Sequence, residues 1–313
     1  MAVMHCCAPL PPLHCTTLYS IRRPPTSRMS CSFSSHMDQQ NEIGKKKFTD
    51  FPYVSVPQRN LMVELVSMLE TRLNPYLQPC NLPPDVQYYH NQTGTAQASL
   101  HIRSGLESSP IDLILGSWLH CELPSGGALN ITSLSAYLNT STDAPNYLLE
   151  LIQNSPTSLI LILDLPPRKD LILHPEYLTT FYDDTQLDKH RQLLEKIPGV
   201  RPYVSSSLYI RSVVSPTAIL ICIDTEAGGK ENMEEMVRDH VSPIAKEVLG
   251  VWLDQCACGD REVEETERSI LAKRDQMIKN KTIEIDLGSS LPRLFGSDVA
   301  ARVLGAIREV YNA

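Results

Sequence analysis

The sequence predicts a single α/β domain in which helices cover both faces of a largely antiparallel central sheet, a three-layer α/β/α sandwich. Residues Leu159 to Leu163 form a continuous apolar run, which is typical of a strand buried on both faces. Several other strand-like segments follow one another without regular crossover helices, which favours antiparallel pairing. Most helical patterns come later in the chain, so helices remain to cover the sheet.

The first half of the chain contains one clear helical pattern and most of the strand patterns. Leu61, Leu65 and Leu69 recur at helical spacing within residues 58–73, which predicts an amphipathic helix. Pro145 is well placed at a helix start, and it predicts a short helix over residues 146–154. We expect strands at residues 97–103, 111–119, 129–138 and 159–163.

The second half of the chain is expected to be mostly helical. Ser215 and Pro216 suggest the turn of a hairpin between strands at 203–214 and 217–224. A helical pattern at 231–256 is interrupted at Ser242-Pro243, and Ser297 is expected to cap the last helix. The remaining elements are expected to be helices at residues 186–196, 260–279 and 298–311 and a short strand at residues 283–287.

The N-terminal extension has the composition of an organelle transit peptide. Residues 1–37 contain no Asp or Glu, and their only Lys or Arg residues are Arg22, Arg23 and Arg28. A merely disordered tail is the alternative. Residues 38–50 are expected to be a flexible leader, and residues 51–313 a single catalytic domain.

Charge and cysteine usage exclude several classes of protein. Removing the transit peptide takes the formal charge from −8 to −11, which argues against a nucleic-acid partner. No apolar stretch approaches the roughly 20 residues that span a bilayer. The remaining cysteines are odd in number and irregularly spaced, which favours a reducing compartment over a disulfide framework.

The sequence also lacks the motifs of a resident redox centre. It contains no G-x-G-x-x-G motif for a dinucleotide and no cysteine set suited to an iron–sulfur cluster. Cys256 and Cys258 have no second pair or nearby His to complete a metal site. If the protein is a reductase, we therefore expect no bound cofactor and no metal.

Four long, colinear segments resemble the red chlorophyll catabolite reductase family, plant enzymes that reduce the opened chlorophyll macrocycle during leaf senescence. The first is SPTSLILILDLPPRKDLILHPEYL, and the next is VRPYVSSSLYIRSVVSPTA. The others are MVRDHVSPIAKEVLGVWLDQC and IEIDLGSSLPRLFGSDVA. Together they cover much of the chain after the N-terminal extension.

The resemblance implies a fold shared with ferredoxin-dependent bilin reductases and a specific reaction. Red chlorophyll catabolite, a linear tetrapyrrole, would be reduced to the primary fluorescent catabolite with electrons from reduced ferredoxin. The resemblance also implies a partnership with pheophorbide a oxygenase, a homodimer, and a place in the chloroplast stroma, with mitochondria left open as a second location.

The resemblance further directs attention to particular residues. It implies that Glu150 and Asp286 line the substrate pocket, although local pattern alone indicates two solvent-exposed carboxylates. Both carboxyl groups are candidates for proton delivery; the alternative is that one or the other of them stays ionised and accepts the pyrrole N–H groups. It implies that Val214 packs against the substrate and biases the product epimer, whereas a plain hairpin-end valine is the alternative. Because Arg suits carboxylates, Arg201 and Arg211 are candidate partners for the substrate propionate, as is Arg168.

Docking of an acidic ferredoxin requires a local basic patch on this acidic chain. One candidate patch consists of Arg268, Lys273, Arg274, Lys279 and Lys281. A solvated helix of mixed charge is the alternative, because four glutamates lie in the same segment.

Two other functions remain open at this point. A non-catalytic scavenger would bind phototoxic tetrapyrroles without reducing them, and a reductase of heme-derived bilins would share the electron donor.

Overall fold

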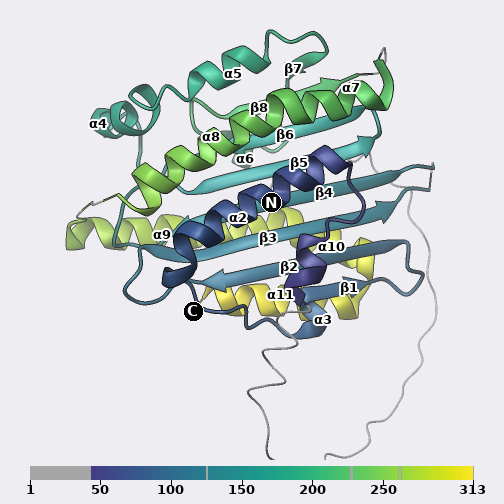
Figure 1. The fold of residues 1–313 in the computed structure, drawn as a ribbon. Coiled ribbons are helices and arrows are strands. Elements are labelled where there is room, and N and C mark those ends of the chain that lie inside the picture. The colour runs from purple at the N-terminus through teal and green to yellow at the C-terminus, as the bar shows by residue number, and fades with distance from the viewer. Residues whose placement is uncertain (1–43, 125, 226–227, 260, 262, 313) are drawn as a thin grey trace, which may run out of the picture.

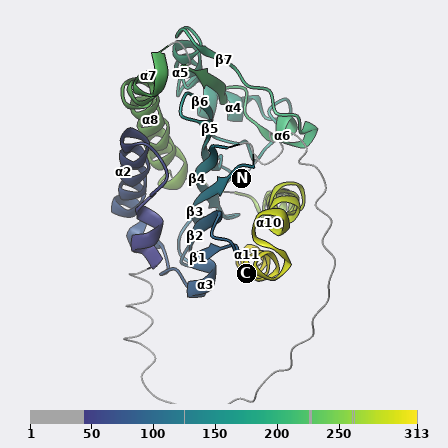
Figure 2. The ribbon, with the colours of Figure 1, turned by 90° about the vertical axis from the view of Figure 1, so that its right-hand side faces the viewer.

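The computed structural model describes residues 44–124, 126–225, 228–259, 261 and 263–312 (Figure 1). Their strands form one sheet in the order β1-β2-β3-β4-β5-β6-β8-β7, and all neighbours in it are antiparallel. The sheet lies between two layers of helices (Figure 2), which confirms the predicted sandwich. The strands are β1 Tyr88–His90, β2 Ala96–Ser104, β3 Ile111–Glu122, β4 Ala128–Leu138, β5 Tyr147–Ser155, β6 Ser158–Asp164, β7 Val200–Pro202 and β8 Ile219–Asp224.

One face of the sheet carries α2 and a long helical segment over residues 229–257 (Figures 1 and 2). Ser55 caps α2 by accepting a hydrogen bond from the backbone N–H of Gln58. Alternate side chains of the strands, such as Leu149 and Leu161, pack against this layer and Trp252 in the largest core. The helices of this layer are α2 Val56–Leu73, α7 Gly229–Met236, η5 Val237–Val241, α8 Ser242–Trp252 and η6 Leu253–Ala257.

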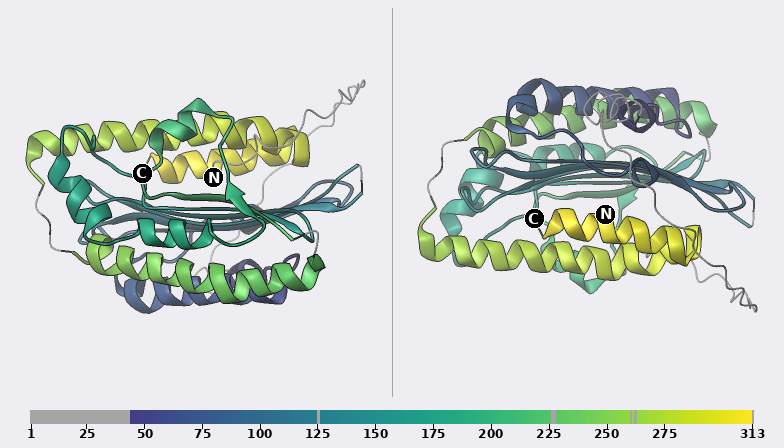
Figure 3. Two further views of the ribbon diagram at one scale, coloured as in Figure 1. Left: turned by 90° about the horizontal axis from the view of Figure 1, so that it is seen from above. Right: turned by 90° about the horizontal axis from the view of Figure 1, so that it is seen from below.

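The other face carries the C-terminal helices and α6 (Figures 2 and 3). Leu100, Leu115, Val303 and Ile307 belong to the second core, which fills the space between β2, β3 and α11. The elements of this layer are α6 Leu208–Val213, α9 Glu265–Thr282, η7 Ile283–Leu287, α10 Gly288–Phe295 and α11 Ser297–Tyr311. Shorter elements at the sheet edges are η2 Asn74–Tyr76, α3 Pro84–Gln87, α4 Pro175–Leu178, η3 Thr179–Asp183 and α5 Asp188–Leu194.

The predicted N-terminal segments are described only in part. The transit peptide over residues 1–37 and the start of the leader lie outside the described residues. Residues 44–49 are helical rather than a flexible leader. The reason is Phe48, which is buried and stacks on His101 with ring centroids 5.3 Å apart.

A helix is predicted over residues 146–154, but Tyr147–Ser155 form strand β5. Tyr147, Leu149 and Leu151 alternate toward the α2 layer, and β5 pairs with β4 on one side and β6 on the other. The polar residues Asn146 and Glu150 are spaced like one face of a helix, which is why the local pattern misled the prediction. The correction turns the side chain of Glu150 toward the opposite face of the sheet.

The predicted hairpin over residues 203–224 is also wrong in its first half. Ser207 accepts a hydrogen bond from the backbone N–H of Ile210 and thereby starts helix α6. The strand that pairs with β8 is the shorter β7, whose Val200 lies opposite Ile223. Val214 is therefore the residue that ends a helix rather than a strand.

The C-terminal half of the chain contains three further differences from the sequence-based expectation. Residues 283–287 are not a strand but a π-helical turn, η7, that joins α9 to α10. Helix α8 begins at Ser242-Pro243 directly after the π-helical turn η5, so the helical path continues where an interruption was expected. Gly296 precedes α11, and Ser297 is its first residue rather than its cap.

Candidate active site

Glu150 occupies the middle of the sheet on the face toward the C-terminal helices. In the strand register it lies opposite Ser133 of β4 and Ile162 of β6, and Ser133 lies opposite Ser117 of β3. Directly opposite residues of antiparallel strands point to the same face. The serines and Glu150 therefore form a polar row on an otherwise apolar surface. Glu150 itself is only 1% exposed.

Asp286 approaches the same row from the helical layer. It lies in η7, where the π-helical turn is followed directly by α10, and it is 4% exposed. Its Oδ1 atom is buried and has no hydrogen-bond partner among the described residues. Burial, reinforced by the charge of Glu150, raises the pKa of Asp286 to about 7.

The two carboxyl groups line one small cavity between the sheet and the C-terminal helices. This cavity has a volume of about 60 Å³ and is walled mostly by apolar side chains, including Leu100, Leu119 and Leu287. Asp286 also lines a neighbouring cavity of about 70 Å³. The two cavities therefore meet at Asp286.

A third and much larger cavity continues this row. It has a volume of about 580 Å³ and shares Tyr209, Val213 and Ile278 with the 70 Å³ cavity. The third cavity therefore adjoins the 70 Å³ cavity at these three residues, and the 70 Å³ cavity adjoins the 60 Å³ cavity at Asp286. Only the third has the size of an ordinary small-molecule site, which is about 300–1,000 Å³.

Helix α6 forms part of this wall and is fixed to the sheet by a buried hydrogen-bonded pair. Ser215 follows α6 and donates its backbone N–H to Oδ2 of Asp164 at 3.0 Å, and its hydroxyl to Oδ1. Burial raises the pKa of Asp164 to about 6, although the bonds from Ser215 oppose that rise. Val213 lines two cavities, whereas Val214 ends the helix and is not among the residues that line the three cavities.

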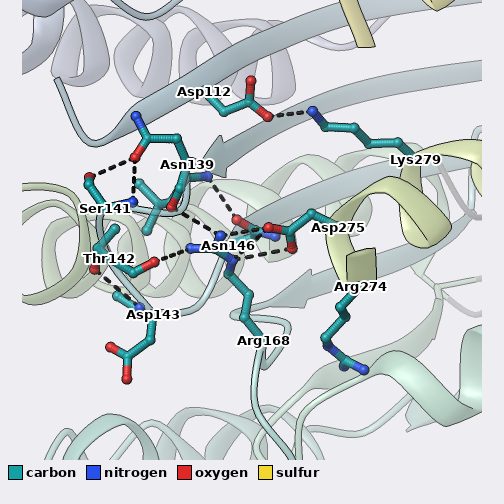
Figure 4. A network of polar contacts seen from close by, with 12 residues as sticks. Asp112, Asn139, Ser141, Thr142, Asp143, Asn146, Arg168, Arg274, Asp275 and Lys279 are labelled. Atoms are coloured by element: carbon teal, nitrogen blue, oxygen red, sulfur yellow. Dashed lines mark hydrogen bonds and ion pairs between the residues drawn. The ribbon is translucent and has the colours of Figure 1, made fainter. Parts of the chain in front are cut away.

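The three arginines considered for a substrate carboxylate lie elsewhere or are already bound. Arg201 and Arg211 are exposed, and neither lines the three cavities. Arg168 lines the largest cavity, but its buried guanidinium is held by Asp275 at 2.6 Å and by the carbonyl of Thr142 at 2.6 Å (Figure 4). These contacts use the guanidinium of Arg168 to hold α9 in place. Arg168 is therefore not free to bind a substrate carboxylate.

Part of the basic cluster proposed for ferredoxin docking is engaged in ion pairs within the protein. Lys279 is buried in an ion pair with Asp112 (Figure 4). Arg268 and Lys281 form surface pairs with Glu265 and Glu284. The five residues therefore do not form one uniformly basic surface.

Sequence reasoning missed two parts of this site. It made no prediction for Asp164, although a carboxylate that ends a fully apolar run indicates a buried partner. It also overlooked the cavity beside α9, because the turn and helices that surround it are far apart in the sequence.

Comparison with solved structures defines the class of fold. The structure resembles phytochromobilin synthase from tomato, solved in complex with biliverdin, with a TM-score of 0.56 and 17% sequence identity. The match covers 79% of this chain and 84% of the tomato chain. This likeness confirms the predicted bilin-reductase-like fold.

Sequence comparison then identifies the family. Residues 57–309 match the family described as red chlorophyll catabolite reductase. A chloroplastic red chlorophyll catabolite reductase of Arabidopsis thaliana is 50% identical over 96% of this chain and 98% of its own length. A chloroplastic relative from Oryza sativa is 48% identical over 83% of this chain and 79% of its own length. The chain belongs to the red chlorophyll catabolite reductase family, a family of oxidoreductases of chlorophyll breakdown.

These comparisons agree with the expected chloroplast location, because both of these relatives are named as chloroplastic. Within the described residues, no helix combines the length and apolar character needed to cross a membrane. In the same part of the chain, no group of three or more His, Cys, Asp or Glu side chains is arranged to hold a metal ion.

Proposed function

We propose that this chain reduces red chlorophyll catabolite to the primary fluorescent chlorophyll catabolite with electrons from reduced ferredoxin. The reaction saturates one carbon–carbon double bond at the methine bridge next to ring A. It consumes two electrons, from two reduced ferredoxin molecules, and two protons. Family membership supports the substrate, and no electron carrier bound to the protein is needed in this scheme.

The observation that carries this proposal is the buried carboxyl pair. Asp286 is surrounded by apolar side chains, and its pKa of about 7 leaves a large fraction of the carboxyl protonated at neutral pH. A protonated carboxyl beside an electron-rich pigment is suited to act as a general acid. A tetrapyrrole in the site would also exclude water from the radical formed after the first electron.

The two carboxyl groups then have different tasks. Asp286 has an oxygen without a hydrogen-bond partner among the described residues and a raised pKa, so we assign it the proton transfer to the substrate carbon. Glu150 belongs to the polar row of the sheet, where its carboxyl oxygens would accept the pyrrole N–H groups and fix the orientation of the pigment.

The remaining proposals concern specificity and partners. Val214, at the end of α6, would bias which face of the substrate receives a proton, and the epimer ratio of a Val214→Phe variant tests this.

Ferredoxin would dock in the chloroplast stroma, with a second location in mitochondria still open. Direct transfer of substrate from pheophorbide a oxygenase and assembly as a homodimer also remain proposals, to be tested by co-purification and by sedimentation.

An anaerobic turnover assay tests the proposed function. Purified protein is mixed with red chlorophyll catabolite and chemically reduced ferredoxin, and blue product fluorescence is followed together with loss of the pigment's absorption. We expect multiple turnovers that require both proteins. Stoichiometric binding without loss of absorption would instead identify a scavenger, and preferential reduction of biliverdin in competition would identify a reductase of heme-derived bilins.

A further inference from the structure

The largest cavity lies beside the carboxyl pair but outside the residues that the proposed chemistry uses. It is bounded by α9, α6 and the segment over residues 168–174, and its volume of about 580 Å³ is that of a small-molecule site. The cavities at Glu150 and Asp286, at about 60 and 70 Å³, have room for only a few water molecules. A tetrapyrrole that reaches Asp286 therefore has most of its available space in the largest cavity.

The walls of this cavity expose large apolar side chains to solvent. Leu173 is 75% exposed, Ile270 is 67% exposed and Met277 is 52% exposed, and all three line the same space. Scattered exposed apolar residues are ordinary, but a group that lines one concave space of ligand size indicates a binding surface. A flat, apolar ligand would cover these side chains.

Among the described residues, two cationic groups that line the cavity form no ion pair, whereas the anionic groups of its wall are engaged. Lys169 is held by Asp143 and Glu267, and the carboxylate of Asp170 accepts the backbone N–H groups of Ile172 and Leu173. The anions of the cavity wall are thus engaged within the protein.

Lys273 and Arg274 differ from the other charged residues of the wall. Lys273 is exposed and forms no hydrogen bond or ion pair with any described residue. Arg274 donates Nε and Nη2 to the carbonyl of Pro167, and it points away from the Arg168–Asp275 pair (Figure 4). Both residues line the cavity next to its apolar wall. Such a combination suits a ligand with an apolar body and a carboxylate.

We propose that this cavity binds the carboxylate-bearing edge of the tetrapyrrole, with Lys273 and Arg274 pairing with the substrate propionate. The apolar wall covers the adjacent pyrrole ring, and the reacting bridge extends past Tyr209 and Val213 toward Asp286. This subsite rests on the proposed function. It assigns to α9 the role that the sequence had suggested for Arg168, Arg201 and Arg211.

A comparison of two ligands tests the subsite without requiring turnover. Binding of red chlorophyll catabolite and of its propionate methyl ester to the full-length protein is measured by fluorescence quenching. We expect the wild type to bind the free acid more tightly than the ester. Lys273→Gln should weaken binding of the acid by about two- to fivefold, the effect of an exposed ion pair, and leave binding of the ester unchanged.

Matched variants test whether the effect of Lys273→Gln comes from the lost positive charge or from a general change in the protein. Lys273→Arg should retain the preference for the acid, because it keeps the positive charge. Lys246→Gln on α8 removes a lysine from the opposite face of the sheet and should change neither affinity. Met277→Glu places a charge in the apolar wall and should weaken binding of both ligands.

The outcomes distinguish this inference from the proposed function. An unchanged acid-to-ester ratio in Lys273→Gln, in a protein that still reduces the pigment, would overturn the subsite alone. Failure of the wild type to bind either ligand would overturn both.

Discussion

At the residue scale, the site depends on carboxyl groups placed where charge is disfavoured. Asp286 is 4% exposed, with one oxygen that no described residue hydrogen-bonds, and Glu150 is 1% exposed on a mostly apolar face. Burying such groups opposes folding unless hydrogen bonds or protonation compensate. Residues that weaken stability in this way are typical of functional sites.

The burial of Asp286 predicts that Asp286→Asn changes how the free energy of unfolding depends on pH. Burial raises the pKa of Asp286 above that of the unfolded chain, so its stabilising contribution as a neutral group is complete below about pH 4 and is lost as the pH rises through about 7. Asn stays neutral throughout. We therefore expect the variant to be more stable than the wild type at pH 8, by at most about 4 kcal/mol, and the difference to shrink toward pH 4. Urea unfolding at several pH values measures this, and parallel pH profiles would contradict it.

The sequence alone was least informative about these residues. Glu150 and Asn146 have the spacing of a polar helix face, and Asp286 alternates with Ile285 and Leu287 as a solvent-facing strand residue would. In both cases tertiary packing overrides the local pattern. The resemblance to a family, rather than any periodicity, directed attention to the pair.

At the scale of elements, α6 connects the substrate wall to the sheet. Ser215 binds Asp164 at the end of β6, and this contact fixes the backbone directly after Val214. The position of Val214 therefore depends on a buried polar contact as well as on its own side chain.

This arrangement predicts that Val214→Phe changes the ratio of product epimers, because a larger side chain alters the face on which the pigment is accessible. Ser215→Ala should shift the ratio in the same assay by a smaller amount, since it removes one of the two bonds to Asp164. Val204→Phe in the exposed loop before α6 is the control and should leave the ratio unchanged. Chiral chromatography of the product measures the epimer ratio. A wild-type ratio in Val214→Phe would show that Val214 does not influence which face of the pigment is protonated.

The elements that the sequence predicted well share one property, which is a simple apolar pattern. β3 and β6 contain continuous apolar runs, and α2 has regular helical spacing. The segments whose type of element was predicted wrongly are β5, α6 and η7, and residues of all three line the cavities. At these places the local pattern agrees less well with the fold, so the residues of the candidate site are the hardest to place from sequence.

At the scale of the whole molecule, the fold positions the cavities between a rigid sheet and the C-terminal helices. The sheet supplies Glu150 from its centre, and α9 is fixed to the sheet side by the Arg168–Asp275 pair and the Lys279–Asp112 pair (Figure 4). These contacts hold η7, and with it Asp286, against the face of the sheet that carries Glu150. The fold class followed from the order of apolar segments, because that order alone favours an antiparallel sheet with helices on both faces.

The most direct measurement of the central claim is anaerobic turnover of red chlorophyll catabolite by the wild type, Asp286→Asn and Glu150→Gln, with reduced ferredoxin and with pigment binding measured in parallel. We expect Asp286→Asn to lose about a hundredfold or more in turnover while still binding the pigment, because the substitution removes the general acid and keeps the shape of the side chain. It also predicts weaker and less ordered binding in Glu150→Gln. Full turnover by Asp286→Asn would contradict the assignment of proton delivery to Asp286, and unchanged pigment binding by Glu150→Gln would contradict the role given to Glu150.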